Sequence, residues 1–212
     1  SCTMLSMGLA EKQQKIKELR EKISVCTRCA LHKTRTNTVP GEGDVNAAIM
    51  FIGEAPGRNE DLQGKPFVGR AGEVFDRLLN SVGLTRQQIY LCNILKCRPP
   101  GNRNPLPSEI NACIGSLDIQ IKIINPQVIG TLGNFSTDYI FKKFNIPPAK
   151  ISSVAGKVID IETLLGPKKI IPVFHPAVAT YNAHKIDLLL SHFQAFKQFC
   201  SKKGDTDFES DT

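Results

Sequence analysis

The chain has 212 residues, of which 41% are hydrophobic, and a formal net charge of +7. This length and hydrophobic content suit one compact α/β domain, and the positive charge favours nucleic acid over other partners. No apolar run approaches the roughly 18 residues of a transmembrane helix, which argues against a membrane protein. The first ten residues lack the pattern of a secretory signal, so we expect an intracellular, cytoplasmic protein in which residues 1–10 form a flexible start, 11–200 one folded domain and 201–212 a disordered tail.

The first predicted element is an amphipathic helix from Leu9 to Ser24, with its apolar residues on one face. It leads into Cys26 and Cys29, whose spacing places two thiolates on one tight turn, as zinc and iron–sulfur sites require. Cys97 and Cys113 are the candidates for two further ligands. Four thiolates suit either a structural zinc or an iron–sulfur cluster, and their spacing does not choose between them. The alternative is that they are small buried hydrophobic residues.

Four apolar segments predict the buried parallel strands of a central sheet. Each ends in a polar residue or a turn, where open α/β sheets bind their ligands. The segments are Ile49–Ile52 before Gly53 and Glu54, Ile89–Leu95 with Asn93, Val128–Leu132 before Gly133 and Asn134, and Ile170–Phe174 before His175. We therefore expect a carboxylate, amides and an imidazole at one rim of the sheet. The alternative is that these are ordinary exits from strand to loop, with polar residues there by chance.

Residues 57–72 are too polar and too rich in glycine for a strand, and they predict an active-site loop. Within it, Phe67 has no apolar partner at a periodic spacing, so it is a candidate stacking platform for a planar ligand; the alternative is a plug that holds the loop on the core. The remaining elements predicted from the sequence are helices from Glu73 to Val82, Ser108 to Ile124, Ser136 to Phe144 and Ile186 to Phe199, and a hairpin between Ile151 and Leu165.

Two stretches are candidate sites for phosphate groups. The rigid loop from Pro99 to Pro107, with Arg98 and Arg103, lies between two of the cysteines and would present its guanidinium groups with little loss of entropy. The alternative is a solvated turn with two unrelated charges. The helix that begins at Ser136 would bind a phosphate on its free amides.

Several short motifs occur together in one order. They are Gly53-Glu54-Ala55-Pro56-Gly57, the loop from Gly64 to Gly72, Asn93 ahead of Lys96-Cys97-Arg98-Pro99-Pro100, and His175-Pro176-Ala177. From about Cys26 to Phe199 the chain thus resembles the family 4, iron–sulfur type uracil-DNA glycosylases of the uracil-DNA glycosylase superfamily. Several motifs in agreement are far more specific than any one of them.

The resemblance implies a single-domain, three-layer αβα fold with a central, mainly parallel four-stranded sheet. It implies a monofunctional hydrolase of base excision repair that flips deoxyuridine out of single- or double-stranded DNA, hydrolyses the N-glycosidic bond, and leaves free uracil and an abasic site. It also implies that Cys26, Cys29, Cys97 and Cys113 hold a 4Fe-4S cluster with a structural role. We expect a monomer, with a replication clamp as a candidate partner.

The resemblance also assigns roles in the base pocket. Asn93 would accept a hydrogen bond from uracil N3–H and donate one to O4, a pattern that cytosine reverses. Phe67 would stack on the extruded base, and the turn from Gly53 to Ala55 would bring backbone close to it. His175 would donate to O2, where negative charge develops as the bond breaks; the alternative is a cap on the following helix.

The group that activates water is the least determined part of the site. Ala55 stands where the related family 1 enzymes have an aspartate, which leaves Glu54, Glu60 and Asp61 as the nearby carboxylates. The last two would otherwise form a solvated face of the loop.

The segment from Val178 to Tyr181 would enter the DNA stack, with Tyr181 or Val178 as the wedge. Two other classes of protein stay open. One is a superfamily member with another base preference or a covalent DNA-trapping relative, and the other is a metal-stapled, non-catalytic protein that binds nucleic acid regardless of uracil.

Overall fold

The structure, a computed structural model, describes residues 7–200. Residues 1–6 and 201–212, and with them the expected disordered tail and most of the expected flexible start, lie outside the described residues. The first helix, α1 (Leu9–Ser24), has the bounds that its apolar spacing predicts, so the end of that expected start is helical. None of the helices described is both long enough and apolar enough to cross a membrane.

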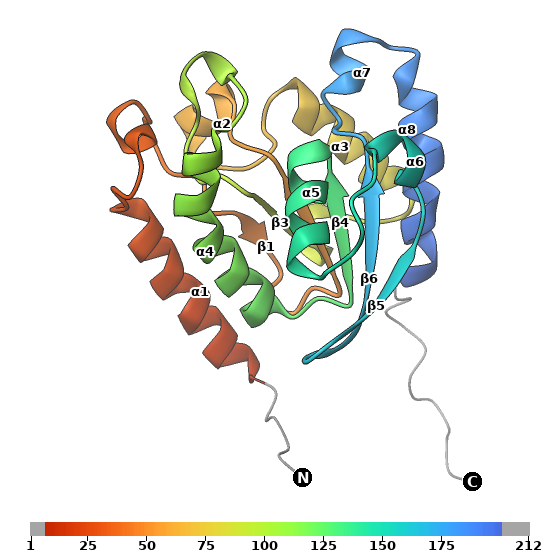
Figure 1. Ribbon diagram of the computed structural model, residues 1–212, viewed down its shortest axis with the longest axis horizontal. Helices are drawn as coiled ribbons and strands as arrows, with labels where there is room; N and C mark the ends of the chain where they lie inside the picture. Colours follow the sequence, from red (N-terminus) through yellow and green to blue (C-terminus); the bar gives the residue numbers. More distant parts are fainter. Residues whose placement is uncertain (1–6, 201–212) are drawn as a thin grey trace, which may run out of the picture.

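One mixed sheet of six strands, in the order β1-β3-β2-β4-β6-β5, forms the centre of the molecule (Figure 1). The inner strands run parallel and correspond to the predicted segments: β3 (Tyr90–Asn93), β2 (Ile49–Gly53), β4 (Val128–Leu132) and β6 (Gly166–Val173). The edge strands run antiparallel to their neighbours: β1 (Glu42–Gly43) beside β3, and β5 (Ile159–Thr163) beside β6.

The expected number of four strands is therefore wrong. β1 has only two residues, too few for a periodic pattern, and its place depends on pairing with β3. β5 alternates partly buried and exposed side chains, which is a weaker signal than the unbroken apolar runs of the inner strands. The predicted hairpin is shifted along the chain: it pairs β5 with β6, and its first residues form the short helix α6 (Ile151–Val154).

Helices cover both faces of the sheet, which gives three layers. On one face, α1 packs beside α4 (Pro107–Ile124), together with α5 (Asn134–Lys143) (Figure 1). On the other face lie α3 (Arg70–Ser81), α8 (Lys185–Phe193) and the 3-10 turn η4 (Gln194–Phe199). These helices begin within three residues of the predicted positions, because each buries an apolar stripe against the sheet. The predicted helix from Ile186 to Phe199 is α-helical only as far as Phe193 and continues as η4.

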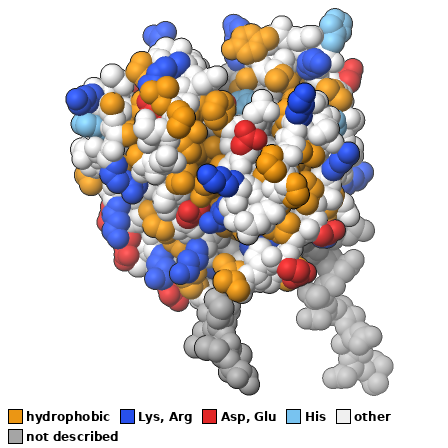
Figure 2. All heavy atoms as spheres, in the orientation of Figure 1, with side chains coloured by type: hydrophobic (Ala, Val, Ile, Leu, Met, Phe, Trp, Pro, Cys, Tyr) orange, Lys and Arg blue, Asp and Glu red, His pale blue; other side chains and the backbone are white. Residues whose placement is uncertain are grey.

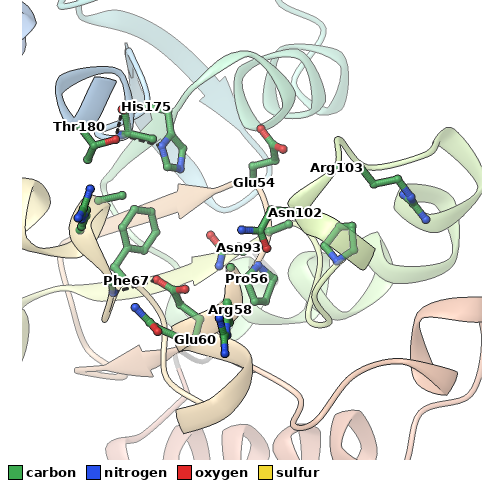
Figure 3. A pocket seen from close by; sticks show the side chains of 18 of the residues that line it. Glu54, Pro56, Arg58, Glu60, Phe67, Asn93, Asn102, Arg103, His175 and Thr180 are labelled. Atoms are coloured by element: carbon green, nitrogen blue, oxygen red, sulfur yellow. Dashed lines mark hydrogen bonds between the residues drawn. The ribbon is translucent and has the colours of Figure 1, made fainter. Parts of the chain in front are cut away.

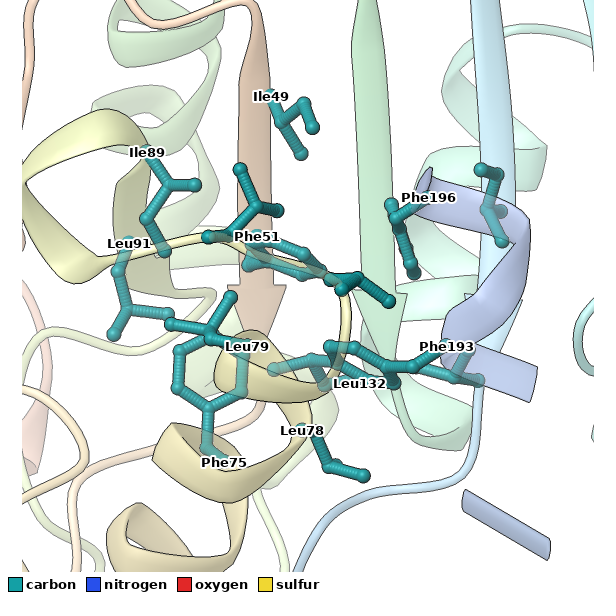
Figure 4. Close-up of a cluster of buried hydrophobic side chains, with 14 of the residues drawn as sticks. Ile49, Phe51, Phe75, Leu78, Leu79, Ile89, Leu91, Leu132, Phe193 and Phe196 are labelled. Carbon is teal, nitrogen blue, oxygen red and sulfur yellow. The ribbon is translucent and has the colours of Figure 1, made fainter. Parts of the chain in front are cut away.

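Phe51, in the middle of β2, illustrates how the sheet is held. It is fully buried, and its ring contacts Phe75 of α3 at 5.2 Å between centroids, and Phe193 and Phe196 at 5.7 and 4.8 Å (Figure 4). All residues of β2 are buried, which is why its sequence is an unbroken apolar run. Packing on both faces fixes the carboxyl end of the strand, where the site begins.

Short helical segments occupy several connections. Two of them follow inner strands: α2 (Arg58–Gln63), in the predicted active-site loop, and α7 (Val178–Tyr181), in the segment expected to enter DNA. Both lie at the same end of the sheet (Figure 1). Three further 3-10 turns are η1 (Ala30–Lys33), η2 (Arg86–Gln88) and η3 (Pro100–Asn102).

Candidate active site

A cavity of about 580 Å³ opens at the carboxyl ends of the inner strands. Glu54 after β2, Asn93 at the end of β3, His175 after β6 and Phe67 from the loop line it together (Figure 3). Figure 2 shows the molecule hollowed at this end, with Lys and Arg side chains on both sides of the hollow. The fold thus gathers at one rim side chains that are far apart in the sequence.

Asn93 presents its side-chain amide to the cavity from a buried position. It is 2% exposed, and its Oδ1 has no hydrogen-bond partner among the described residues. Gly53 lies beside it on β2, and a Cβ at Gly53 would come within 2.3 Å of that oxygen, so only glycine fits there. The backbone carbonyl of Asn93 accepts a 2.6 Å bond from the buried Lys96 ammonium, which fixes the strand end. A buried acceptor without a donor costs about 1–3 kcal/mol, which a ligand N–H would offset.

Phe67 forms one wall of the cavity. Its ring lies 5.6 Å from that of His175, with 22° between the planes, and 5.2 Å from the ring of Phe75 in the core. Its backbone has a φ of 52°, in the left-handed region that glycine adopts far more readily. Phe67 therefore packs on the core, like the plug that one interpretation predicts, and also lines the cavity, where a stacking platform would have to lie.

His175 carries a donor whose position is fixed by its own backbone. Its Nδ1 accepts a 3.1 Å bond from the amide of Ala177, so the neutral ring holds its proton on Nε2. Burial lowers the pKa of His175 to about 4, so the ring is neutral at physiological pH. The alternative role as a cap is also present, because Ala177 immediately precedes α7. That role uses Nδ1 alone and leaves Nε2–H for a ligand.

Glu54 is the carboxylate that is most free to act on a ligand. It lines the cavity next to Ala55, and it makes no hydrogen bond through its side chain with any described residue. Burial raises the pKa of its carboxyl. A carboxylate that takes up a proton more readily than one in water suits a general base.

Glu60 and Asp61 have structural partners. The Oε1 of Glu60 accepts bonds of 3.2 Å from the amides of Val68 and Gly69, which ties α2 to the start of α3. Asp61 is buried outside the cavity and accepts a 2.9 Å bond from the amide of Thr36. Neither is the solvated loop face that the sequence allowed, although Glu60 still lines the cavity.

Arg98 and Arg103 are held by neighbours within their own segment. Arg103 forms a two-bond ion pair with the buried Glu109, at 2.6 and 3.0 Å. Arg98 donates a 2.6 Å bond to the side chain of Asn102. Arg103 lines the cavity and Arg98 does not, so the structure separates the two arginines that the sequence grouped together.

Ser136 does not reach the surface. It is fully buried, and its hydroxyl donates to the carbonyl of Gly133 at 3.4 Å. Gly133 gives room to the imidazole, since a Cβ there would lie 3.2 Å from that of His175. The end of β4 thus supports the site. The helix α5 begins at Asn134, two residues before the predicted start, and the buried Ser136 side chain is not accessible to a phosphate; a phosphate on the free amides of the helix start stays a prediction.

Two guanidinium groups that the sequence interpretation missed flank the cavity. Arg58 and Arg70, the first residues of α2 and α3, line it, are exposed, and form no ion pair with the described residues. In Figure 3, the side chain of Arg58 points away from Asn93. Tyr181 of α7 stands at the rim and is 91% exposed. A signal for the arginines was present, because each directly follows a glycine in the loop already indicated.

The four predicted metal ligands line a second, small pocket that shares no residue with the cavity. Cys26 and Cys29 come from the turn after α1, Cys97 from the segment after β3, and Cys113 from α4. Among residues 7–200, no three His, Cys, Asp or Glu side chains converge closely enough to hold a single metal ion.

Two of these sulfurs accept hydrogen bonds from arginines. Arg28 donates to Cys26 Sγ at 3.5 Å, and Arg35 donates to Cys97 Sγ at 3.4 Å. Burial alone would raise the pKa of the Cys26 thiol, but the hydrogen bonds from Arg28 and the nearby positive charges outweigh it and lower that pKa. Burial instead raises the pKa of the Cys97 and Cys113 thiols. Donors aimed at the sulfurs of Cys26 and Cys97 favour their thiolate forms, which suits a metal or cluster site.

Comparison with known proteins agrees with this geometry. Residues 40–201 match the model of the uracil DNA glycosylase superfamily, to which the chain therefore belongs. The type-4 uracil-DNA glycosylase of Archaeoglobus fulgidus is 42% identical over 92% of this chain and 98% of its own length. That of Saccharolobus solfataricus is 45% identical, over 87% and 86%, and that of Thermotoga maritima 40%, over 91% and 98%. Within the superfamily, the chain is a member of the type-4 uracil-DNA glycosylases.

Proposed function

We propose that this chain is a monofunctional glycosylase that extrudes deoxyuridine from DNA and hydrolyses its N-glycosidic bond, leaving free uracil and an abasic site. The observation that carries the proposal is the unpaired, buried Oδ1 of Asn93 in the cavity. Family membership supports the same reaction.

The amide of Asn93 selects the base. Uracil offers an N3–H donor and an O4 acceptor, which match Oδ1 and the NH2 group of one amide. Cytosine presents the reversed pattern at these positions and would leave both buried groups unpaired. Sites that read a polar pattern in this way discriminate by about 10⁴-fold or more. The ring of Phe67 stacks on the flat face of the base, and Gly53 leaves room for the base beside the amide of Asn93.

His175 stabilises the leaving group. As the glycosidic bond breaks, its electron pair passes to the uracil ring, and part of the negative charge falls on O2. A neutral Nε2–H aimed at O2 binds the transition state more strongly than the ground state, because the charge is present only in the former. Since the pKa of His175 is about 4, this donor is available without a change of protonation at neutral pH.

Glu54 acts on the water. The sugar becomes oxocarbenium-like, water adds to its C1′, and the carboxylate of Glu54 accepts the proton that the water loses. The unpaired state and raised pKa of Glu54 support this role over Glu60, whose carboxylate already accepts two backbone bonds. Glu60 instead holds the loop beside the base.

Positively charged groups at the mouth of the cavity bind the DNA backbone. Arg58 and Arg70, which form no ion pair with the residues that the structure describes, are better placed for phosphates than Arg98, and Arg103 contributes from the opposite loop. Tyr181 is the wedge that fills the space of the extruded base, because it is the exposed aromatic residue at the rim. Action as a monomer stays a prediction. A replication clamp stays a predicted partner.

We further propose that Cys26, Cys29, Cys97 and Cys113 hold a 4Fe-4S cluster. Each thiolate of such a cluster binds a different iron, so the four sulfurs need not meet at one point, which agrees with the lack of a single-ion site among the described residues. When bound, the cluster supplies cross-links between α4, the segment after β3 and the turn after α1. Zinc is the alternative for the same four ligands.

The test is incubation of the purified holoprotein with end-labelled oligonucleotides that carry one deoxyuridine, cytosine, thymine or hypoxanthine, followed by hot alkali. Cleavage confined to the uracil strand, and lost in Asn93→Ala and His175→Ala, is the expected result. Cleavage of another strand would point to a different base preference. Salt-sensitive binding without any cleavage would leave a non-catalytic DNA-binding protein.

A further inference from the structure

We propose that Arg86, which lies outside the cavity, is a positioning residue for base stacking: it holds the backbone of Phe67 in the conformation that places the ring in the cavity wall. This inference rests on the proposed uracil excision and adds a residue to it. The backbone of Phe67 has a conformation that is unusual for a residue with so large a side chain.

Phe67 has a φ of 52°. Residues other than glycine rarely adopt this region, and bulky residues there persist only when their surroundings determine the conformation. Two glycines leave room for it: a Cβ at Gly72 would lie 1.9 Å from the carbonyl oxygen of Phe67, and one at Gly53 would lie 2.9 Å from its ring. These glycines permit the conformation, but they do not hold it.

Arg86 of η2 supplies the attachment. Its Nη1 donates a 2.9 Å bond to the carbonyl of Pro66, and its Nη2 donates to the carbonyl of Phe67. These carbonyls belong to the two peptide planes that flank the Cα of Phe67. One guanidinium therefore fixes both planes, and with them both φ and ψ of this residue. A planar fork of donors can do this, whereas a lysine ammonium cannot span both oxygens in the same way.

The guanidinium is itself held in place. Its Nε donates a 2.6 Å bond to Asp76 of α3, and its Nη1 lies 3.8 Å from a carboxylate oxygen of Glu42. Its Cζ lies over the ring of Phe75, 5.9 Å from the centroid. Arg86 does not line the cavity, so it acts on a base only through Phe67. The result is a stacking ring set 5.6 Å from the ring of His175 before any ligand binds.

The test compares Arg86→Lys and Arg86→Gln with Arg77→Gln, an exposed arginine of α3 outside the cavity lining. We expect kcat/KM on a uracil oligonucleotide to fall by about 10- to 100-fold in the Arg86 variants, because a displacement of about 1 Å can have this effect. Affinity for free uracil, measured by inhibition, should fall in parallel. Arg77→Gln should stay within about twofold of the parent.

A double-mutant cycle separates positioning from general stability. If Arg86 acts through the ring, Arg86→Lys should cost less than about threefold in a Phe67→Ala background, since the group that it positions is gone. Asp76→Asn, which leaves both backbone bonds of Arg86 possible, provides a second variant with a smaller expected loss. Fully multiplicative losses in the cycle, or unchanged uracil affinity in both Arg86 variants, would overturn the inference while leaving uracil excision intact. A parent protein that does not cleave the uracil strand would overturn both.

Discussion

The base cavity and the cysteine pocket are held in different ways. In the cavity, Asn93 and His175 extend from the ends of strands that are packed on both faces, and the large apolar clusters on either side of the sheet support them. The cysteine pocket joins a turn, a loop and a helix, and its apolar support is the smallest cluster, of Leu31, Leu95 and Cys97. The cavity is therefore organised before a ligand binds, whereas under the proposed 4Fe-4S cluster the cysteine pocket would depend on the bound cluster to hold its segments together. Changes in the first should alter chemistry, and changes in the second should alter stability.

Replacing Asn93 by alanine should give the largest effect and separate the two regions most clearly. We expect uracil excision to fall by about 10³-fold, because the fixed polar partner of the base is lost. The free energy of unfolding should stay the same or rise by about 1 kcal/mol, because a buried oxygen without a partner is removed. Single-turnover kinetics and urea unfolding measure the two quantities. Substantial activity together with lower stability would contradict the comparison.

Replacing Cys113 by serine tests the contribution of the cysteine pocket to stability. The variant should lose the brown absorbance of the cluster and its Tm should fall by about 10 °C, since a site assembled from separate segments contributes directly to folding. The control is Cys200→Ser, which changes a partly buried thiol at the end of η4. Cys92→Ser is unsuitable, because Cys92 is a fully buried strand residue. Absorbance and thermal unfolding of both variants give the answer. A Cys113→Ser protein with unchanged Tm would show that the pocket is not a structural cross-link.

His175 gives the cavity a pH signature. Its pKa is about 4 in the folded protein and about 6.5 in the unfolded chain, so between these values the unfolded chain binds more protons. Stability should therefore be constant with respect to this group above pH 6.5 and fall as pH drops, by about 2–3 kcal/mol at pH 4.5. His175→Gln should remove that part of the acid sensitivity, and His184→Gln, at an exposed position, should retain it. Denaturant unfolding at neutral and acid pH compares the three proteins; equal acid sensitivity would contradict the assignment.

The same contrast explains what the sequence could and could not predict. The inner strands and the helices on the sheet were predictable, because burial leaves periodic or unbroken apolar patterns along the chain. The residues at the strand ends followed from the rule that ligands bind there. The pairing of Arg103 with Glu109, the burial of Ser136 and the bonds from Glu60 to backbone amides left no periodic pattern, because each depends on the exact conformation of a loop or helix start, which apolar spacing does not report. For the same reason, the sequence interpretation favoured Arg98 over Arg58 and Arg70.

Arg70→Ala should give the smallest effect and sharpen the account of the rim. If Arg70 meets one phosphate, its loss should lower the slope of log affinity against log salt by about 0.7–0.9 and weaken binding by less than about tenfold near 0.1 M salt, without changing the preference for uracil. Arg77→Ala, seven residues further along the same helix, is the matched control because it removes the same net charge away from the cavity. Binding of DNA with a non-hydrolysable deoxyuridine analogue, measured over a range of salt concentrations, distinguishes them. Equal slopes for the two variants would show that Arg70 contributes only to the overall positive charge and contacts no phosphate.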